Sequence, residues 1–167
     1  KEQGDDIIFI GKLKNDYGGS QVYKYLESRQ KILSAPDLNM DNHLRIDKFV
    51  YKTIRKFNIS SAHDLSEGGF LIALAESCFN PSGLVGATIK KEHLGITNDL
   101  QMFAETQGCY ILSCKSSESK EIESFGKRNN IDVRIIGKVG GNKITIKNMF
   151  SLSVSSLFKR WNDAFPR

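Results

Sequence analysis

The sequence lacks any hydrophobic run long enough to cross a membrane. Its longest apolar stretch, residues 70–75, is far shorter than the ~20 residues that a transmembrane helix needs. No positively charged and then apolar leader opens the chain, so we expect no secretory signal. No internal repeat and no low-complexity tract is evident either, which argues against repeat architectures and disorder. We therefore predict a cytoplasmic protein with no membrane partner.

Cysteine is scarce. Cys78, Cys109 and Cys114 form no Cys-x-x-Cys pair, and their odd number argues against a closed disulfide framework. A catalytic thiol needs a neighbouring base, and the sequence places none beside these residues. We expect reduced thiols that fill the protein interior.

A strong excess of charge of one sign is also missing. The chain has 24 Lys and Arg against 19 Asp and Glu, a net charge of +5 and an isoelectric point near 9.1. The basic residues are scattered among acidic ones, which is typical of a solvated surface, so we expect no nucleic-acid partner. A freestanding binding module remains an alternative that rests on the isoelectric point alone, and steeply salt-dependent binding to nucleic acid would support it.

With 167 residues, of which 40% are hydrophobic and 26% charged, the chain is long enough for one domain with its own core. Hydrophobic periodicity and turn residues predict five or six strands and five helices. Strands are expected within residues 6–11, 61–63, 84–90, 109–114, 133–136 and 143–147, and a hairpin turn at 140–142 is expected to join the last two. Helices are expected at residues 20–28, 40–57, 70–78 and 116–129, and from residue 154 onward. The predicted fold class is α/β (α+β): a mixed β-sheet with helices on both faces, in three layers.

Residues 61–76, SAHDLSEGGFLIALAE, carry the clearest chemical signal. Strand-like residues lead into an acidic turn with paired glycines and then into an apolar helix. This order aims backbone N–H groups out of the turn, where they can bind phosphate. The structural alternative is that Ser66 merely caps a buried helix, and the residues alone leave both interpretations open. Because the helix is apolar around most of its circumference, we expect it between layers or under a neighbouring domain.

Three further elements accompany this turn along the chain. They are a Gly-Gly-Ser turn and helix in residues 13–26, the segment MFAETQ at 102–107, and IGKVGG within 136–146. Together the four elements resemble the C-terminal domain of the phosphoribosylformylglycinamidine synthase family, in the aminoimidazole ribonucleotide synthetase-related superfamily. The resemblance covers nearly the whole chain. It departs at Ala104 and Thr106, where the family usually has serines, and after Gln107, where Gly108-Cys109 replaces a common serine and arginine.

The resemblance implies that residues 1–167 are a single C-terminal lobe of a larger multidomain enzyme, inactive alone. That family uses ATP to convert formylglycinamide ribonucleotide to formylglycinamidine ribonucleotide. The implied cofactors are ATP or ADP and Mg²⁺, and the implied role of this lobe is structural or as an auxiliary nucleotide site. No catalytic residue is assigned here, because the family's catalytic histidine belongs to an N-lobe. The alternative is the C-lobe of a sister enzyme: aminoimidazole ribonucleotide synthetase, thiamine-monophosphate kinase or selenophosphate synthetase.

The resemblance also implies a set of site residues. Asp64 would be a ligand of Mg²⁺, since hard cations prefer carboxylate oxygens. His63 would either orient a neighbour or serve the structure alone. The predicted nucleotide or phosphate contacts are Ser66, Gly68, Gly69, Glu105 and Gln107. The implied partners are the N-terminal lobes of the same polypeptide, a glutaminase subunit, a small accessory subunit and the nucleotide substrate.

Overall fold

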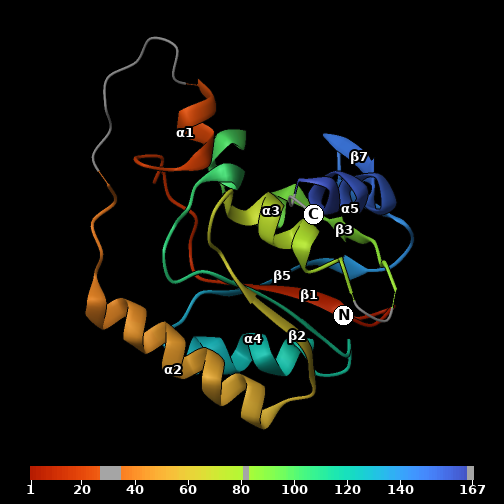
Figure 1. The fold of residues 1–167 in the computed structure, drawn as a ribbon. Helices are drawn as coiled ribbons and strands as arrows, with labels where there is room; N and C mark the ends of the chain where they lie inside the picture. Colours follow the sequence, from red (N-terminus) through yellow and green to blue (C-terminus); the bar gives the residue numbers. More distant parts are fainter. Residues whose placement is uncertain (27–34, 81–82, 165–167) are drawn as a thin grey trace.

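Seven strands form one mixed sheet in the computed structural model, which describes residues 1–26, 35–80 and 83–164 (Figure 1). The strands are β1 (Asp6–Ile10), β2 (Ile59–Asp64), β3 (Ala87–Ile89), β4 (Tyr110–Cys114), β5 (Val133–Val139), β6 (Lys143–Ile146) and β7 (Phe150–Ser153). The α-helices are α1 (Gln21–Leu26), α2 (Met40–Lys56), α3 (Gly69–Glu76), α4 (Ser119–Arg128) and α5 (Val154–Asp163). Two 3-10 helices, η1 (Lys91–His93) and η2 (Asp99–Phe103), lie between β3 and β4.

The strand β1 is the centre of the fold and is buried on both faces. Its residues alternate between two cores, with Ile7 and Phe9 on one side and Ile8 and Ile10 on the other, all fully buried. This two-sided burial explains why DIIFI is an almost continuous apolar run. The predicted strand is therefore confirmed.

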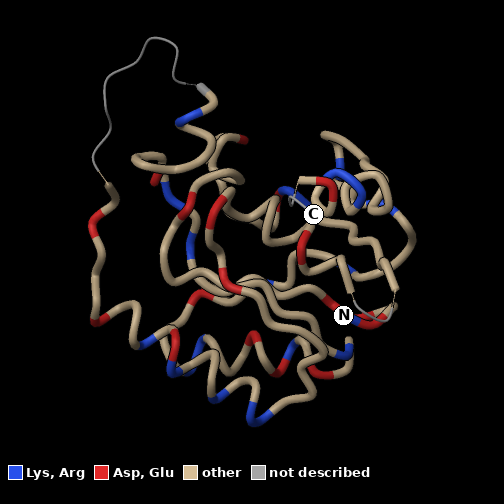
Figure 2. The backbone as a smooth tube through the Cα atoms, viewed as in Figure 1, with Lys and Arg blue, Asp and Glu red and all other residues tan. Residues whose placement is uncertain are grey.

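Helices cover both faces of the sheet, as predicted. In Figure 1, α2 and α4 lie on one side and α3 and α5 on the other. The long helix α2 turns Ile46, Phe49 and Val50 inward, and its basic residues lie among acidic ones on the surface (Figure 2). Asn39 caps this helix through its side-chain oxygen, which accepts a hydrogen bond from the N–H of Asn42 at 2.9 Å. The prediction of an amphipathic helix over the sheet is confirmed.

The sheet order is β2-β4-β1-β5-β3-β6-β7, and only β3 and β6 run parallel to each other. The predicted hairpin between β5 and β6 is wrong, because β3 lies between them. The glycines of that turn bond to the segment before β3: Gly140 N–H donates to the Gly86 carbonyl, and Gly86 N–H donates to the Gly141 carbonyl, both at 2.8 Å. The hairpin joins β6 to β7 instead, and β7 brings the strand count slightly above the expected number.

On the α2 and α4 face, the described helices cover only part of the sheet. The buried cluster on that side takes no described residue from β3, β6 or β7. Polar side chains stand there instead, and Thr145 and Ser151 share a hydrogen bond of 2.8 Å between their hydroxyl groups. The two ends of the sheet are therefore covered unequally.

Some expectations are only partly tested. Ser20 caps α1 as predicted, since its hydroxyl accepts from the N–H of Tyr23 at 3.3 Å, but the predicted end of that helix at 27–28 lies outside the described residues. Within the described part of the chain, no helix is long and apolar enough to span a bilayer.

Candidate functional site

The turn at residues 64–69 connects the end of β2 to the start of α3. Leu65 anchors it: the side chain is buried, and its N–H donates to the carbonyl of Cys109 at 2.9 Å. Gly68 and Gly69 both have positive φ, 79° and 67°. A Cβ on Gly69 would lie 2.5 Å from the carbonyl oxygen of Ala104, so the turn needs glycine both for its conformation and for this close approach. The contact brings residues 104–105 against the turn.

Glu105 is the acceptor that joins two helix beginnings. One carboxylate oxygen, Oε1, accepts from the N–H of Gly68 and from the N–H of Gln21, each at 2.8 Å. Gly68 is the N-cap of α3 and Gln21 opens α1, so a negative charge is favoured at both positions. The side chain of Gln21 also donates to Glu67 at 3.2 Å. The segment after η2, the turn and α1 are therefore held together by one half-buried carboxylate.

The helix cap proposed from the sequence is wrong. The N-cap of α3 is Gly68 and no side chain caps it, while Ser66 contributes its backbone carbonyl, which accepts from Gly69 N–H at 3.1 Å. The Ser66 hydroxyl and the Asp64 carboxylate are both on exposed residues, and the carboxylate makes no hydrogen bond or ion pair with any described residue. Two of the predicted contacts, Gly68 and Gly69, thus donate within the chain, whereas Asp64 and Ser66 face outward.

His63 links Asp64 to two helices. Its Nδ1 lies 2.6 Å from the backbone carbonyl of Asp64, so this nitrogen carries the proton and donates. Its Nε2 lies 3.6 Å from Glu76 on α3, and the indole N–H of Trp161 on α5 donates to the same carboxylate at 3.3 Å. The histidine contacts the backbone of Asp64, and its two predicted roles stay predictions.

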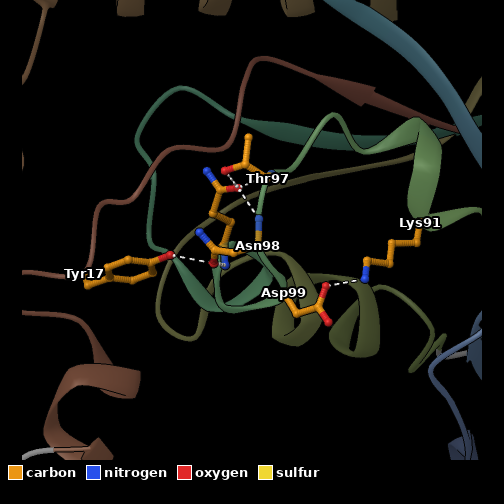
Figure 3. A network of polar contacts seen from close by, with 6 residues as sticks. Tyr17, Lys91, Thr97, Asn98 and Asp99 are labelled. Atoms are coloured by element: carbon orange, nitrogen blue, oxygen red, sulfur yellow. Dashed lines mark hydrogen bonds and ion pairs between the residues drawn. The ribbon is translucent and has the colours of Figure 1, made fainter.

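A polar network fastens the loop before α1 to η2 (Figure 3). The hydroxyl of Tyr17 donates to Asn98, which caps η2, at 3.3 Å. The side-chain oxygen of Gln101 accepts from the backbone N–H of Thr97 at 2.6 Å. Lys91 forms an ion pair with Asp99 at the far end of the same loop. The network fixes the segment that carries Glu105, and the sequence offers no signal for it because its members are up to 84 positions apart.

Gln107 lies in a different environment from Glu105. It is exposed and lines a cavity of about 20 Å³ together with Lys14, Asn42 and His43. That space suits a single water molecule. His43 is half-buried and lies 3.5 Å from Asp47, which accepts from the hydroxyl of Tyr110 at 2.6 Å. Burial, reinforced by Asp47, raises the pKa of Tyr110.

The cysteine prediction is confirmed, since all three are buried and unpaired as disulfides. Burial raises the pKa of Cys109 and of Cys114 to about 12, which suppresses the reactive thiolate. Within the described residues, no group of three or more His, Cys, Asp and Glu side chains is arranged to hold a metal ion. Asp64 would therefore supply a single protein ligand.

Comparisons with known proteins identify the family of this chain. Residues 2–147 match the sequence model of the C-terminal domain of AIR synthase related proteins. Phosphoribosylformylglycinamidine synthase subunit PurL of Alkaliphilus metalliredigens is 31% identical over 147 residues, which are 88% of this chain and 19% of that protein. The chain thus spans about a fifth of the length of this relative.

Solved structures share the fold. Thermotoga maritima PurL complexed with FGAR has a TM-score of 0.76 at 14% identity, covering 94% of this chain and 28% of that chain. Its complex with ATP gives 0.70 at 15% identity, covering 94% and 26%, and the assembly PurLQS from the same organism is also similar. Thiamine-monophosphate kinase from Stenotrophomonas maltophilia gives 0.61 at 15% identity, covering 87% and 51%. The sequence match over most of the chain, together with the shared fold, shows that this chain belongs to the AIR synthase related family as a PurL-like C-terminal domain.

Proposed function

We propose that this chain is the C-terminal lobe of a larger ATP-dependent ligase that converts formylglycinamide ribonucleotide to formylglycinamidine ribonucleotide. The observation that carries the proposal is the 31% identity to PurL over 88% of the chain. The lobe holds an auxiliary or structural nucleotide, works in the cytoplasm and is inactive alone. No catalytic residue is assigned to it.

The turn fits a magnesium nucleotide in part. The Asp64 carboxylate is a hard oxygen donor exposed on the surface, and Mg²⁺ prefers such ligands. A bound Mg²⁺ ion would neutralise phosphate charge. Since the ion usually keeps several waters and takes the remaining ligands from substrate phosphates, one carboxylate from this lobe is sufficient. The Ser66 hydroxyl lies two residues further along the turn and would donate a hydrogen bond to a phosphate oxygen of the nucleotide.

The sequence predicted that Glu105 contacts the nucleotide, but we propose a different role for it. Its carboxylate already accepts from Gly68 N–H, so direct contact with a phosphate would place two anions at one donor. Glu105 is therefore a positioning residue that holds the turn in shape. Gly69 acts in the same way through its close approach to the backbone at Ala104.

The proposed partners are the N-terminal lobes of the same polypeptide, with a glutaminase subunit and a small accessory subunit. The similarity to PurLQS and the 19% coverage of PurL support this proposal. The adjacent helices α3 and α5 offer the surface for a neighbouring lobe, because Ile72 and Trp161 are 41% and 39% exposed there. The sequence of α3 is apolar around most of its circumference, which predicted that a neighbouring layer or domain covers this helix.

Nucleotide titration of the complete polypeptide tests the metal site. Asp64→Asn should weaken Mg²⁺-dependent ADP binding about tenfold or more, corresponding to about 1.4 kcal/mol. Asp163→Asn, on the exposed surface of α5, is the matched control and should leave binding unchanged. An unaltered Mg²⁺ dependence in Asp64→Asn would remove this residue from the site. Amidine formation by residues 1–167 alone, given ATP, Mg²⁺, formylglycinamide ribonucleotide and ammonia, would refute the proposed inactivity.

A sister-enzyme lobe is the second candidate, and the observation in its favour is the fold shared with thiamine-monophosphate kinase. Phosphorylation of thiamine monophosphate by the complete polypeptide, without turnover of formylglycinamide ribonucleotide, would select it.

A further inference from the structure

A groove of about 640 Å³ lies on the part of the sheet that no helix covers. Thr88 of β3 and Ile135 and Gly137 of β5 line it, with α4 contributing Glu123 on one side and η1 contributing His93 on the other. Its volume falls within the roughly 300–1,000 Å³ typical of small-molecule sites. None of its lining residues belongs to the turn at 64–69.

Two lysines stand together at one end of this groove. Lys90 and Lys147 directly follow the parallel strands β3 and β6, whose last residues, Ile89 and Ile146, are register partners. The N–H of Lys147 donates to the carbonyl of Ile89 at 2.9 Å, so the pairing continues to the lysines. Neighbouring strands are about 4.8 Å apart, and like charges in adjacent positions destabilise a sheet. The sequence therefore places two positive charges where they repel each other.

Among the described residues, neither of these ammonium groups has a paired counter-ion, although the Glu123 carboxylate lines the same groove. Lys90 and Lys147 make no side-chain hydrogen bond or ion pair with any described residue, whereas the neighbouring Lys91 is paired with Asp99. The third lysine of the groove, Lys138, donates to Asp6 at 2.6 Å and is neutralised by it. The unbalanced positive charge of the groove is thus concentrated at the carboxyl ends of β3 and β6.

The groove also has an apolar surface, which could contact the organic part of an anionic ligand. Ile135 and Gly137 form a surface without charge, and the ring of His93 is exposed beside them. The Nδ1 of His93 lies 2.9 Å from the Ile135 carbonyl and so donates to it, which fixes the ring at the groove.

We propose that this groove binds an organic phosphate of nucleotide size, with its phosphate groups between Lys90 and Lys147 and its organic part over Ile135 and Gly137. Two adjacent ammonium groups match the two or more negative charges of a diphosphate, and binding relieves their mutual repulsion. The site goes beyond the proposed magnesium nucleotide site, since it uses lysines in place of a metal ion.

Calorimetric titration of the complete polypeptide with ADP, in EDTA so that no Mg²⁺ is present, tests the proposal. We expect saturable binding that weakens at least about tenfold in the double variant Lys90→Met/Lys147→Met, which keeps the apolar stems and removes two charges. The control Lys120→Met/Lys127→Met removes the same charge from exposed positions of α4 and should bind like the unaltered protein. Inorganic pyrophosphate should compete with ADP, because it presents the phosphate groups alone.

Several results would contradict binding in the groove. Absence of metal-free binding, or equal weakening in both double variants, would overturn the proposal. So would binding that survives Lys90→Met/Lys147→Met and is lost in Asp64→Asn, since that pattern assigns the nucleotide to the turn. Metal-free binding that survives both Asp64→Asn and Lys90→Met/Lys147→Met would overturn the proposal as well. Conversely, metal-free binding that survives Asp64→Asn and weakens in Lys90→Met/Lys147→Met supports the groove even if the proposed magnesium site fails. Preferential binding of an acidic peptide over ADP would refute the small-molecule assignment.

Discussion

Replacing Glu105 tests whether one carboxylate holds the candidate site together. Its Oε1 accepts two backbone hydrogen bonds, from Gly68 and from Gln21, each at 2.8 Å. A hydrogen bond to a charged group contributes about 1.5–3 kcal/mol. Because the side chain is half-buried and water can replace part of the loss, we take the lower value for each bond. Glu105→Ala should therefore lower the free energy of unfolding by about 3 kcal/mol.

The isosteric change separates charge from shape. Glu105→Gln keeps an oxygen at the same position but makes both bonds neutral, at about 1 kcal/mol each, so about one third of the loss should remain. For a chain of this size, each 1 kcal/mol shifts Tm by about 2–4 °C, which predicts a fall of about 6–12 °C for alanine. Thermal and urea unfolding give these values, and amide hydrogen exchange should accelerate at Gly68 and Gln21 in particular.

Gln107→Ala is the matched control, because this side chain is exposed two positions away and should change stability by less than about 0.5 kcal/mol. The reasoning fails if Glu105→Ala is as stable as this control. It also fails if Glu105→Gln lowers the free energy of unfolding as much as Glu105→Ala does. An oxygen kept at this position would then contribute no stability through the two backbone hydrogen bonds.

Further expectations concern the turn, the thiols and the response to acid. Gly69→Ala should destabilise the fold by about 2–4 kcal/mol in urea unfolding through left-handed strain and the 2.5 Å approach to the Ala104 carbonyl, whereas Gly19→Ala, with positive φ and open space, should cost about 1 kcal/mol. The three buried cysteines should resist a thiol reagent at pH 8 in the folded state and react fully in denaturant, because burial raises two of their pKa values to about 12. Burial alone would raise the pKa of Asp6, but hydrogen bonds from Lys138 and two serines lower it. The stability that Asp6 contributes is thus present above its unfolded pKa of about 3.9 and is lost as pH falls through the lower folded value, so Lys138→Met should move acid unfolding to higher pH in a circular dichroism titration.

Equal stability of Gly69→Ala and Gly19→Ala would contradict the close-approach argument. Rapid modification of the folded thiols would show that the interior opens readily. An acid midpoint that is unchanged in Lys138→Met would mean that this lysine does not lower the pKa of Asp6.

Much of the fold was predictable because its signals are local. The apolar run of β1 and the spacing of Ile46, Phe49 and Val50 in α2 each report burial through a few neighbouring residues. The glycine turn after Asp64 was also visible, because paired glycines between a strand and an apolar helix have few other uses. The family resemblance followed from the order of such elements along the chain.

The remaining features depend on partners distant in sequence. Gly140 and Gly141 have the composition of a hairpin turn, but β3 pairs with both flanking strands from 48 or more positions away. The contacts of Glu105 span 37 and 84 positions, and no local pattern indicates them. Lys90 and Lys147 are neighbours only through the parallel pairing of β3 with β6. Chemistry that arises from sheet register is therefore visible only in the fold.

The insertion of β3 between β5 and β6 has a consequence for how often the C-terminal hairpin opens. The hairpin of β6 and β7 forms from contiguous residues, yet it joins the sheet only along β3, a strand of three residues paired on both sides. Among the described strands, residues 143–153 therefore join the sheet through β3 alone, and Ile144 and Ile146 pack in the same core as Ile89. Because a three-residue ladder supplies few backbone hydrogen bonds, we expect the C-terminal hairpin to open more often than β1 and to show faster amide hydrogen exchange.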